Sequence, residues 1–340
     1  MVLLFNVDYS YIILLGKNYM TTDGRRIHMA IICEESRFDS TYSDKKLHLV
    51  LWKDDTIAPK GIVQISHGMC EYVKRYEEFA EALVNAGYVV CGNDHLGHGE
   101  SAADGDELGF MANKDGYLYM VKDLRNITNW VKEQYPGLPL VLYGHSMGSF
   151  LARLYASTYS DGVAAYVFSG TGGPNPASGV AIAMINVMSK FKGEHHRSQF
   201  LTKVAFGSYT SKIEDAKTGY EWVTKDPEKF DAYIHDKFCM YLFTLSGYRD
   251  LMKALGTVSQ KDWAGKLNKD LPYLLVSGEE DPVGDYGKGV LIVYDRMLKA
   301  GCSKTECRLI PGMRHEPHNE INRKDFYRDT IAWIDSAIKK

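Results

Sequence analysis

One serine in this chain lies in a setting that could make its hydroxyl a nucleophile. Residues 144–148 read Gly-His-Ser-Met-Gly, with Ser146 at the centre. An apolar run over 138–143 precedes this pentapeptide, and apolar residues follow it at helical spacing over 147–155. A strand, a tight Gly-x-Ser-x-Gly turn and a helix together hold a serine hydroxyl exposed at the end of a sheet. We therefore predict that Ser146 is a nucleophile, which needs a base and an oxyanion site to react.

In enzymes that hold a nucleophilic serine between a strand and a helix in this way, an acid and then a histidine follow it along the chain. The run 272–277 reads as a buried strand that leads to Asp281, and the run 305–310 reads as a strand that leads to His315. A histidine here would take the serine proton, and the acid would orient the histidine ring and stabilise its imidazolium form. Other candidates for both roles lie close by in the sequence. They are Glu279, Glu280 and Asp285 for the acid and His318 for the base.

Strands and helices alternate over much of the chain, which indicates an α/β fold with a mostly parallel sheet covered on both faces. The runs 61–66, 88–91 and 163–168 read as buried strands, whereas 46–52 alternates and suits an antiparallel strand. Residues 171–258 interrupt this rhythm with apolar and aromatic helical segments. We expect a helical cap here, because insertions in such folds lie over the carboxyl ends of the strands, where sites form.

This interruption divides the predicted core into two parts. The first part of the core spans 36–170, the cap spans 171–258 and the second part of the core spans 259–340, after an extension over 1–35. Apolar runs in the extension are too short and too broken for a transmembrane helix, and no signal-peptide pattern is present. We expect either an additional packed strand or a segment upstream of an alternative start at Met20.

The composition restricts the classes of function. The chain has 340 residues, of which 45% are hydrophobic and 24% charged, and its net charge of −3 argues against a nucleic-acid partner. Its six cysteines include no Cys-x-x-Cys pair and have no histidines at the spacing of a zinc site. We therefore expect unpaired thiols in a cytoplasmic protein and no metal site.

Five motifs with chemically active residues occur in an order known from one family. They are His67-Gly-Met69 with Arg75-Tyr76, Asp94 to Ser101, Gly144 to Gly148, Gly278 to Asp281, and Arg314 to Glu320. From about residue 38 to its end, the chain resembles the monoglyceride lipase and lysophospholipase branch of the α/β-hydrolases, often called serine aminopeptidase-like. The resemblance implies an α/β-hydrolase fold and the catalytic residues Ser146, Asp281 and His315. It also implies an oxyanion hole made by the backbone N–H groups of Met69 and Met147.

Two other places in these motifs bear on the site. Many members carry glycine after the position of Met69, whereas this chain has Cys70, which affects the expected oxyanion loop. Asp94, His95 and His98 have side chains capable of catalysis, but the neighbouring Gly97 and Gly99 permit a tight turn. We expect these three residues to organise that turn.

The resemblance implies a serine hydrolase that cleaves carboxylic esters of lipids, of the monoacylglycerol or lysophospholipid type, through an acyl-enzyme and without a metal or organic cofactor. The expected partners are a small-molecule ester or lipid and, through the cap, a transiently contacted membrane surface. A second hypothesis is a proline-releasing aminopeptidase that holds the substrate amine with acidic cap residues. Candidates for that role are Glu214, Asp215, Asp226 and Glu228. A third hypothesis, a non-catalytic binding protein, is disfavoured because all three triad residue types are present.

Overall fold

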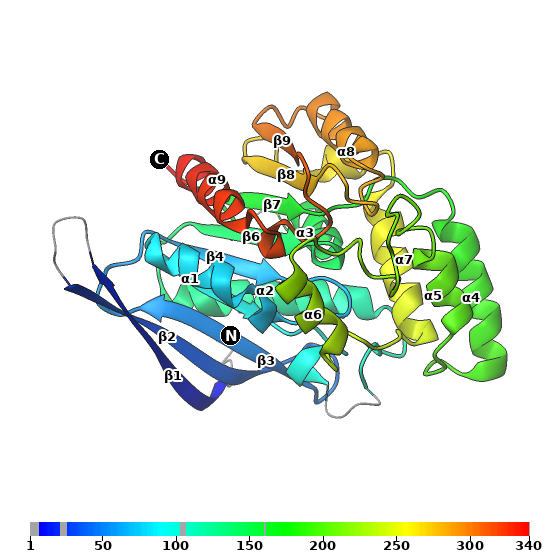
Figure 1. The fold of residues 1–340 in the computed structure, drawn as a ribbon, viewed down its shortest axis with the longest axis horizontal. Coiled ribbons are helices and arrows are strands. Elements are labelled where there is room, and N and C mark those ends of the chain that lie inside the picture. Colours follow the sequence, from blue (N-terminus) through cyan, green and yellow to red (C-terminus); the bar gives the residue numbers. More distant parts are fainter. Residues whose placement is uncertain (1–6, 21–25, 103–106, 160, 340) are drawn as a thin grey trace.

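A twisted nine-stranded sheet forms the centre of the protein in the computed structural model (Figure 1). The structure describes residues 7–20, 26–102, 107–159 and 161–339, with side chains from residue 31 onward. The strand order is β1-β2-β3-β5-β4-β6-β7-β8-β9. The sheet is antiparallel from β1 to β5 and parallel from β5 to β9, which confirms the predicted α/β class with a mostly parallel sheet. The strands are β1 (Val7–Met20), β2 (Arg26–Asp39), β3 (Lys46–Asp54), β4 (Gly61–Ser66), β5 (Tyr88–Asn93), β6 (Leu140–His145), β7 (Ala165–Ser169), β8 (Tyr273–Gly278) and β9 (Thr305–Ile310).

Helices cover both faces of this sheet. Strands β4 and β6 lie at its centre, and every residue of both is buried, as expected for parallel strands enclosed on two sides. Along β6, Val141 and Tyr143 pack with α1 and α9, whereas Leu142 packs with α2, α3 and α8 on the opposite face. The helices are α1 (Glu77–Asn85), α2 (Gly116–Gln134), α3 (Met147–Thr158), α4 (Ser178–Lys192), α5 (Gln199–Phe206), α6 (Pro227–His235), α7 (Leu245–Val258), α8 (Lys288–Lys299) and α9 (Arg323–Ala337).

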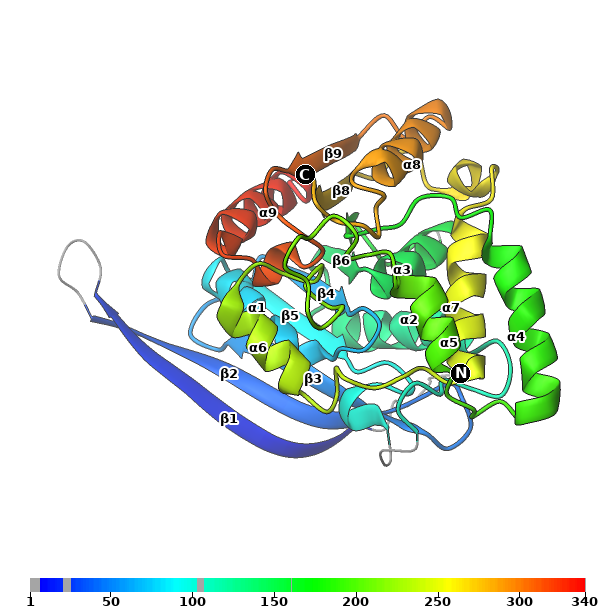
Figure 2. The same cartoon turned by 45° about the vertical axis from the view of Figure 1, so that its right-hand side comes forward.

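The apolar N-terminal segment forms an edge strand of the sheet. Strand β1 pairs with β2 along its whole length, whereas β2 pairs with β3 only from Ile31 onward. The outer part of the β1–β2 hairpin therefore extends beyond the rest of the sheet, as Figures 1 and 2 show. In the part of the chain that the structure describes, no helix has the length and apolar character needed to cross a membrane.

Helices α4 to α7 are inserted between β7 and β8, as the interrupted rhythm predicts. Helices α4, α5 and α7 lie together at one side of the sheet, whereas α6 lies apart from them and near α1 (Figure 2). Arg153 of α3 contacts both ends of this insertion. Its side chain is fully buried. Its guanidinium donates to Thr171 Oγ1 at 3.2 Å, to the carbonyl of Gly172 at 3.0 Å and to that of Val258 at 2.8 Å. It also lies 4.3 Å from the ring centre of Trp263. The helix that follows Ser146 thus anchors the insertion at both of its ends.

Candidate active site

Ser146 lies in a sharp turn between β6 and α3. Its backbone has φ 53° and ψ −121°, a conformation that non-glycine residues rarely adopt and that is often found at functional sites. The flanking glycines are required sterically. A Cβ at Gly148 would collide with the carbonyl oxygen of Ser66, and a Cβ at Gly144 would collide with that of Gly148. The motif thus lets the turn lie directly against the neighbouring strand, which places Ser146 at the carboxyl end of the sheet.

Asp281 and His315 meet at the carboxyl ends of the parallel strands, as Ser146 does. Asp281 follows β8 and is fully buried, and its two carboxylate oxygens lie 2.9 and 3.0 Å from His315 Nδ1. The carboxylate also accepts from the backbone N–H of Val283 at 2.9 Å and from the Ser277 hydroxyl at 3.1 Å. Burial alone would lower the pKa of His315, but the charge and hydrogen bond of Asp281 more than offset it and raise that pKa. The pair thus favours a protonated imidazolium, the form that a general base takes after accepting a proton.

The rival candidates lie in different surroundings. Glu279, Glu280 and Asp285 are exposed, and Glu280 pairs with Lys225 instead of a histidine. His318 is buried and stacked on the Tyr76 ring at a centroid distance of 4.3 Å. Neither of its ring nitrogens has a hydrogen-bond partner among the described residues, and burial lowers its pKa to about 3. His318 is therefore a neutral ring that makes no bond to Asp281.

The two expected oxyanion donors flank Ser146. Met147 is the first residue of α3, so its N–H belongs to the first turn, where backbone donors lack intrahelical partners. Met69 lines the same cavity as Ser146. A Cβ on the neighbouring Gly68 would lie 2.9 Å from Ser146 Cβ, so the loop passes very close to the serine. Cys70 has φ 53°, in the left-handed region that favours glycine, which gives a physical reason for glycine at this position in related sequences.

The Asp94 segment forms a buried turn outside this cavity. Its carboxylate accepts from the backbone N–H groups of Val73 at 2.7 Å and Glu100 at 2.8 Å. Burial lowers the pKa of His95 to about 3 and that of His98 to about 4, so both rings are neutral. These contacts support the expected turn-organising role of the segment.

A cavity of about 490 Å³ opens above Ser146 and His315. Most of its wall is apolar and comes from the inserted segment 171–258. The apolar residues from α4, α5 and α7 are Ala181, Met184, Ile185, Leu201, Val204, Ala205, Phe206, Leu251, Met252 and Leu255. Tyr241, which follows α6, also lines the cavity. The insertion thus forms a largely apolar enclosure around the serine.

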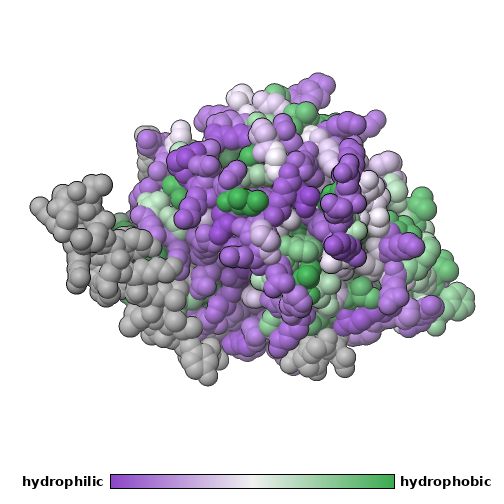
Figure 3. Space-filling model, in the orientation of Figure 1, coloured by the Kyte–Doolittle hydropathy of each residue, from purple (hydrophilic) through white to green (hydrophobic). Residues whose placement is uncertain are grey.

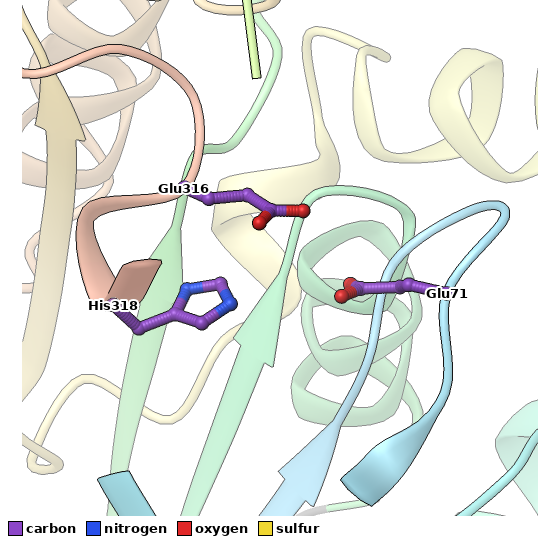
Figure 4. Close-up of side chains that lie close together, drawn as sticks. All are labelled: Glu71, Glu316 and His318. Atoms are coloured by element: carbon purple, nitrogen blue, oxygen red, sulfur yellow. The ribbon is translucent and has the colours of Figure 1, made fainter. Parts of the chain in front are cut away.

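A polar cluster that the motifs do not identify as a unit lies at the wall of this cavity, which Glu71 and Glu316 help to line. Glu71, Glu316 and His318 offer ligand atoms that all lie within 4.8 Å of one another, and Figure 4 shows their side chains converging from two loops. The Arg75 guanidinium donates to both carboxylates, so a protein cation already neutralises much of their charge. The sequence signals for this cluster stand in two separate motifs, because Arg75 belongs to the motif of His67, whereas Glu316 and His318 belong to the motif from Arg314 to Glu320.

Comparison with known proteins identifies the family of this chain. A family model described as serine aminopeptidase, S33, matches residues 57–322. The chain is 29% identical over 292 residues to a monoacylglycerol lipase of Mycolicibacterium smegmatis, which covers 85% of this chain and 92% of that protein. It is 27% identical over 289 residues to the monoglyceride lipase of Homo sapiens, which covers 83% and 84% of the two chains.

The fold also matches a solved structure of an ester-cleaving enzyme. A highly thermostable carboxyl esterase from Bacillus coagulans, in complex with glycerol, is 30% identical and covers 90% of this chain and 99% of its own, with a TM-score of 0.84. The chain therefore belongs to the serine aminopeptidase S33-type family of α/β-hydrolases, as an esterase or lipase that resembles the monoglyceride lipases.

Proposed function

We propose that this protein hydrolyses carboxylic esters of lipids, of the monoacylglycerol or lysophospholipid type, through an acyl-enzyme on Ser146. The observation that carries the proposal is the position of Ser146 and His315 on a cavity whose wall is mostly apolar. A fatty acyl chain suits such a wall, because each buried CH₂ group contributes about 0.8 kcal/mol. Relatives named monoacylglycerol lipase and carboxyl esterase support the same class of substrate.

In the proposed reaction, His315 Nε2 takes the proton of the Ser146 hydroxyl while Oγ attacks the ester carbonyl carbon. The carbonyl oxygen becomes an oxyanion that accepts from the N–H groups of Met69 and Met147, each worth about 3 kcal/mol of transition-state stabilisation. The protonated His315 then gives its proton to the departing alcohol, which leaves the acyl group on Ser146. A water molecule, deprotonated by His315, releases the fatty acid and restores the serine. Asp281 orients the ring throughout.

We also propose residues 171–258 as the cap and its outer face as a contact with lipid surfaces. Five apolar side chains of α4 and α5 are exposed there, and in Figure 3 green surface gathers on the side where α4 lies in Figure 1. They are Val180, Val187, Phe191, Phe200 and Val204. Exposed apolar patches of this kind are typical of protein or membrane contacts.

The compartment that we propose is the cytoplasm. The six free cysteines support a reducing compartment of this kind.

An aminopeptidase is the second candidate, since the family description names that activity. Its predicted amine-binding residues give it little support. Glu214, Asp215 and Glu228 are exposed and, with Asp226, lie outside the residues that line the cavity. Asp226 caps α6 and pairs with Arg323 instead.

An acyl-chain series separates the two activities. The wild-type protein is assayed with nitrophenyl esters from acetyl to octanoyl and with aminoacyl nitroanilides, and labelled with a fluorophosphonate probe. We expect labelling of Ser146 and a kcat/KM that rises with chain length until the cavity is filled. Flat or falling values along the ester series, together with efficient cleavage of the anilides, would favour the peptidase.

A further inference from the structure

Three buried charged side chains connect the oxyanion loop to the loop of the proposed base. They are Glu71, Arg75 and Glu316, called here the bridge cluster. Their side chains are at most 9% exposed. The inference below rests on the proposed function, because it assigns the bridge cluster a part in the reaction of Ser146.

At one end, Glu71 holds the oxyanion loop directly. Its Oε1 accepts from the backbone N–H of Gly68 and from the Tyr76 hydroxyl, the latter at 2.8 Å. Gly68 fits between this carboxylate and Ser146, since a Cβ there would lie 2.6 Å from Glu71 Oε1 and 2.9 Å from Ser146 Cβ. The next residue is Met69, the proposed oxyanion donor. A shift of the Glu71 carboxylate would therefore move the peptide that leads to this donor.

At the other end, Glu316 holds the loop that carries His315. Arg75 donates to both oxygens of Glu316 at 2.7 Å, and its Nη1 also donates to Glu71 at 2.9 Å. A paired, planar contact of this kind restricts the orientation of the carboxylate relative to the guanidinium, as well as the distance between them. The backbone N–H of Glu316 donates to the carbonyl of Val223 at 2.9 Å, so the inserted segment supports the same loop.

The burial of the cluster makes its geometry stringent. Two carboxylates share one guanidinium away from water. Each carboxylate therefore needs its hydrogen bonds to offset the loss of hydration. Burial raises the pKa of Glu71 to about 7. Burial opposes ionisation of Glu316 as well, but Arg75 more than offsets this and lowers its pKa to about 2. The contacts divide the roles in the same way, since Arg75 makes two hydrogen bonds to Glu316 and one to Glu71, and the other oxygen of Glu71 accepts from the loop.

We infer that the bridge cluster positions the Met69 N–H relative to Ser146 and His315, with Glu71 as the positioning residue for the oxyanion loop. Glu71 acts through the Gly68 N–H and forms no bond to the ester. Loss of its acceptor should weaken transition-state stabilisation rather than binding of the acyl chain.

The test compares Glu71→Ala with Glu71→Gln. Both variants are titrated with a fluorophosphonate to count their active sites. The values of kcat and of the rate constant of Ser146 phosphonylation are expressed per titratable site, and KM is measured with them. We expect Glu71→Ala to lower kcat and the phosphonylation rate by about 10- to 100-fold, part of the effect of losing an oxyanion donor, with little change in KM. Glutamine keeps an oxygen that can accept from the Gly68 N–H, so Glu71→Gln should stay within about threefold of the wild type.

Asp123 supplies a matched control. It is a buried carboxylate on α2 that accepts from the backbone N–H of Thr41 at 2.6 Å and from the Ser40 hydroxyl at 2.8 Å, outside the residues that line the cavity. Asp123→Ala should lower the melting temperature without changing the two rates per site. If Glu71→Ala does not fold, Arg75→Lys takes its place, because lysine keeps the charge but not the paired contact, and we expect about a tenfold loss.

Rates per site for Glu71→Ala that equal those of the wild type would overturn the inference. Equal losses in Glu71→Ala and Glu71→Gln would also overturn it. So would an Asp123→Ala variant whose rates per site fall as far as those of Glu71→Ala. Where Arg75→Lys is used instead, unchanged rates in that variant would overturn it. Failure of the proposed function is recognised separately, because kcat/KM of the wild type would then stay flat or fall along the ester series. The phosphonylation rates would still decide the role of Glu71 in that case.

Discussion

Two buried histidines of this protein bind carboxylates through Nδ1, yet their surroundings differ in one respect. His315 binds Asp281 at 2.9 Å and lines the cavity that also contains Ser146. His48 binds Asp94 at 2.9 Å through Nδ1 and Glu35 at 2.8 Å through Nε2. Burial would lower the pKa of both rings, but in both the carboxylates more than offset it and raise the pKa.

The difference lies in the second nitrogen of each ring. Both nitrogens of His48 are bound to carboxylates, and the ring connects β2 and β3 to the Asp94 turn. The His315 ring reaches a cavity large enough for a substrate, and its Nε2 serves Ser146 in the proposed mechanism. A carboxylate partner and a raised pKa therefore do not distinguish a catalytic histidine from a histidine in a structural ion pair. The two are distinguished by whether the second ring nitrogen can reach a reacting group.

The largest expected effect comes from removing the ring at position 315. We expect His315→Ala to lower kcat by roughly 10⁴- to 10⁶-fold, and Ser146→Ala to match it, because triad members act as a unit. His318→Ala should keep most of the turnover and lose stability, since its ring is stacked in the core. Steady-state kinetics with a short nitrophenyl ester measures this. An inactive His318→Ala beside an active His315→Ala would reverse the assignment of the base.

Asp281→Asn should come next, with kcat lowered by about 10⁴-fold because the amide disturbs the tautomer and charge stabilisation of His315. The pH profile gives a second readout. The base must be neutral, so kcat/KM falls as the pH drops through the pKa of His315. Asp281 raises that pKa, so its removal should shift the acidic limb to lower pH.

The exposed Glu280 is the control for this substitution. Glu280→Gln should leave both the plateau and the acidic limb of the profile in place. An acidic limb that does not move in Asp281→Asn would mean that another group sets the protonation of the base.

His48→Asn should affect stability rather than catalysis. We expect a loss of about 1–3 kcal/mol in the free energy of unfolding, because Glu35 and Asp94 lose a buried partner. The folded pKa of His48 is raised, so its contribution is fully present below about pH 6.5, its unfolded value, and disappears as the pH rises through the folded value. Thermal unfolding of both proteins at pH 6 and pH 8.5 should show the larger difference at pH 6. A greater difference at pH 8.5 would contradict the assigned charge state.

The smallest effect on activity is expected from deleting residues 2–19. The deletion removes most of β1, which pairs only with β2 and lies at the opposite edge of the sheet from β8 and β9, the strands that precede Asp281 and His315. We expect an unchanged kcat/KM for short esters, measured on the purified truncated protein. An inactive but folded truncation would show that the hairpin acts on the site from a distance.

Local patterns in the sequence account for much of the fold and for the proposed catalytic residues. Buried apolar runs predict β4, β5, β6 and β8, because strands enclosed on both faces need apolar side chains throughout. The glycines of the Ser146 turn follow from local sterics, since any larger residue would collide with a neighbouring backbone. The apolar N-terminal segment allows a strand, although its pairing partner β2 is not evident from local pattern.

Contacts between distant segments were decided only by the tertiary structure. Arg75 and Glu316 are 241 residues apart, and no local pattern reports their paired hydrogen bonds. The same holds for Arg153 and Val258, which are 105 residues apart, and for the second carboxylate on His48. Periodicity reports which face of an element is buried, because that depends on neighbours a few residues away. Which charged groups meet inside, and which ring nitrogen faces a cavity, depends on how whole elements pack, and only the folded chain determines that.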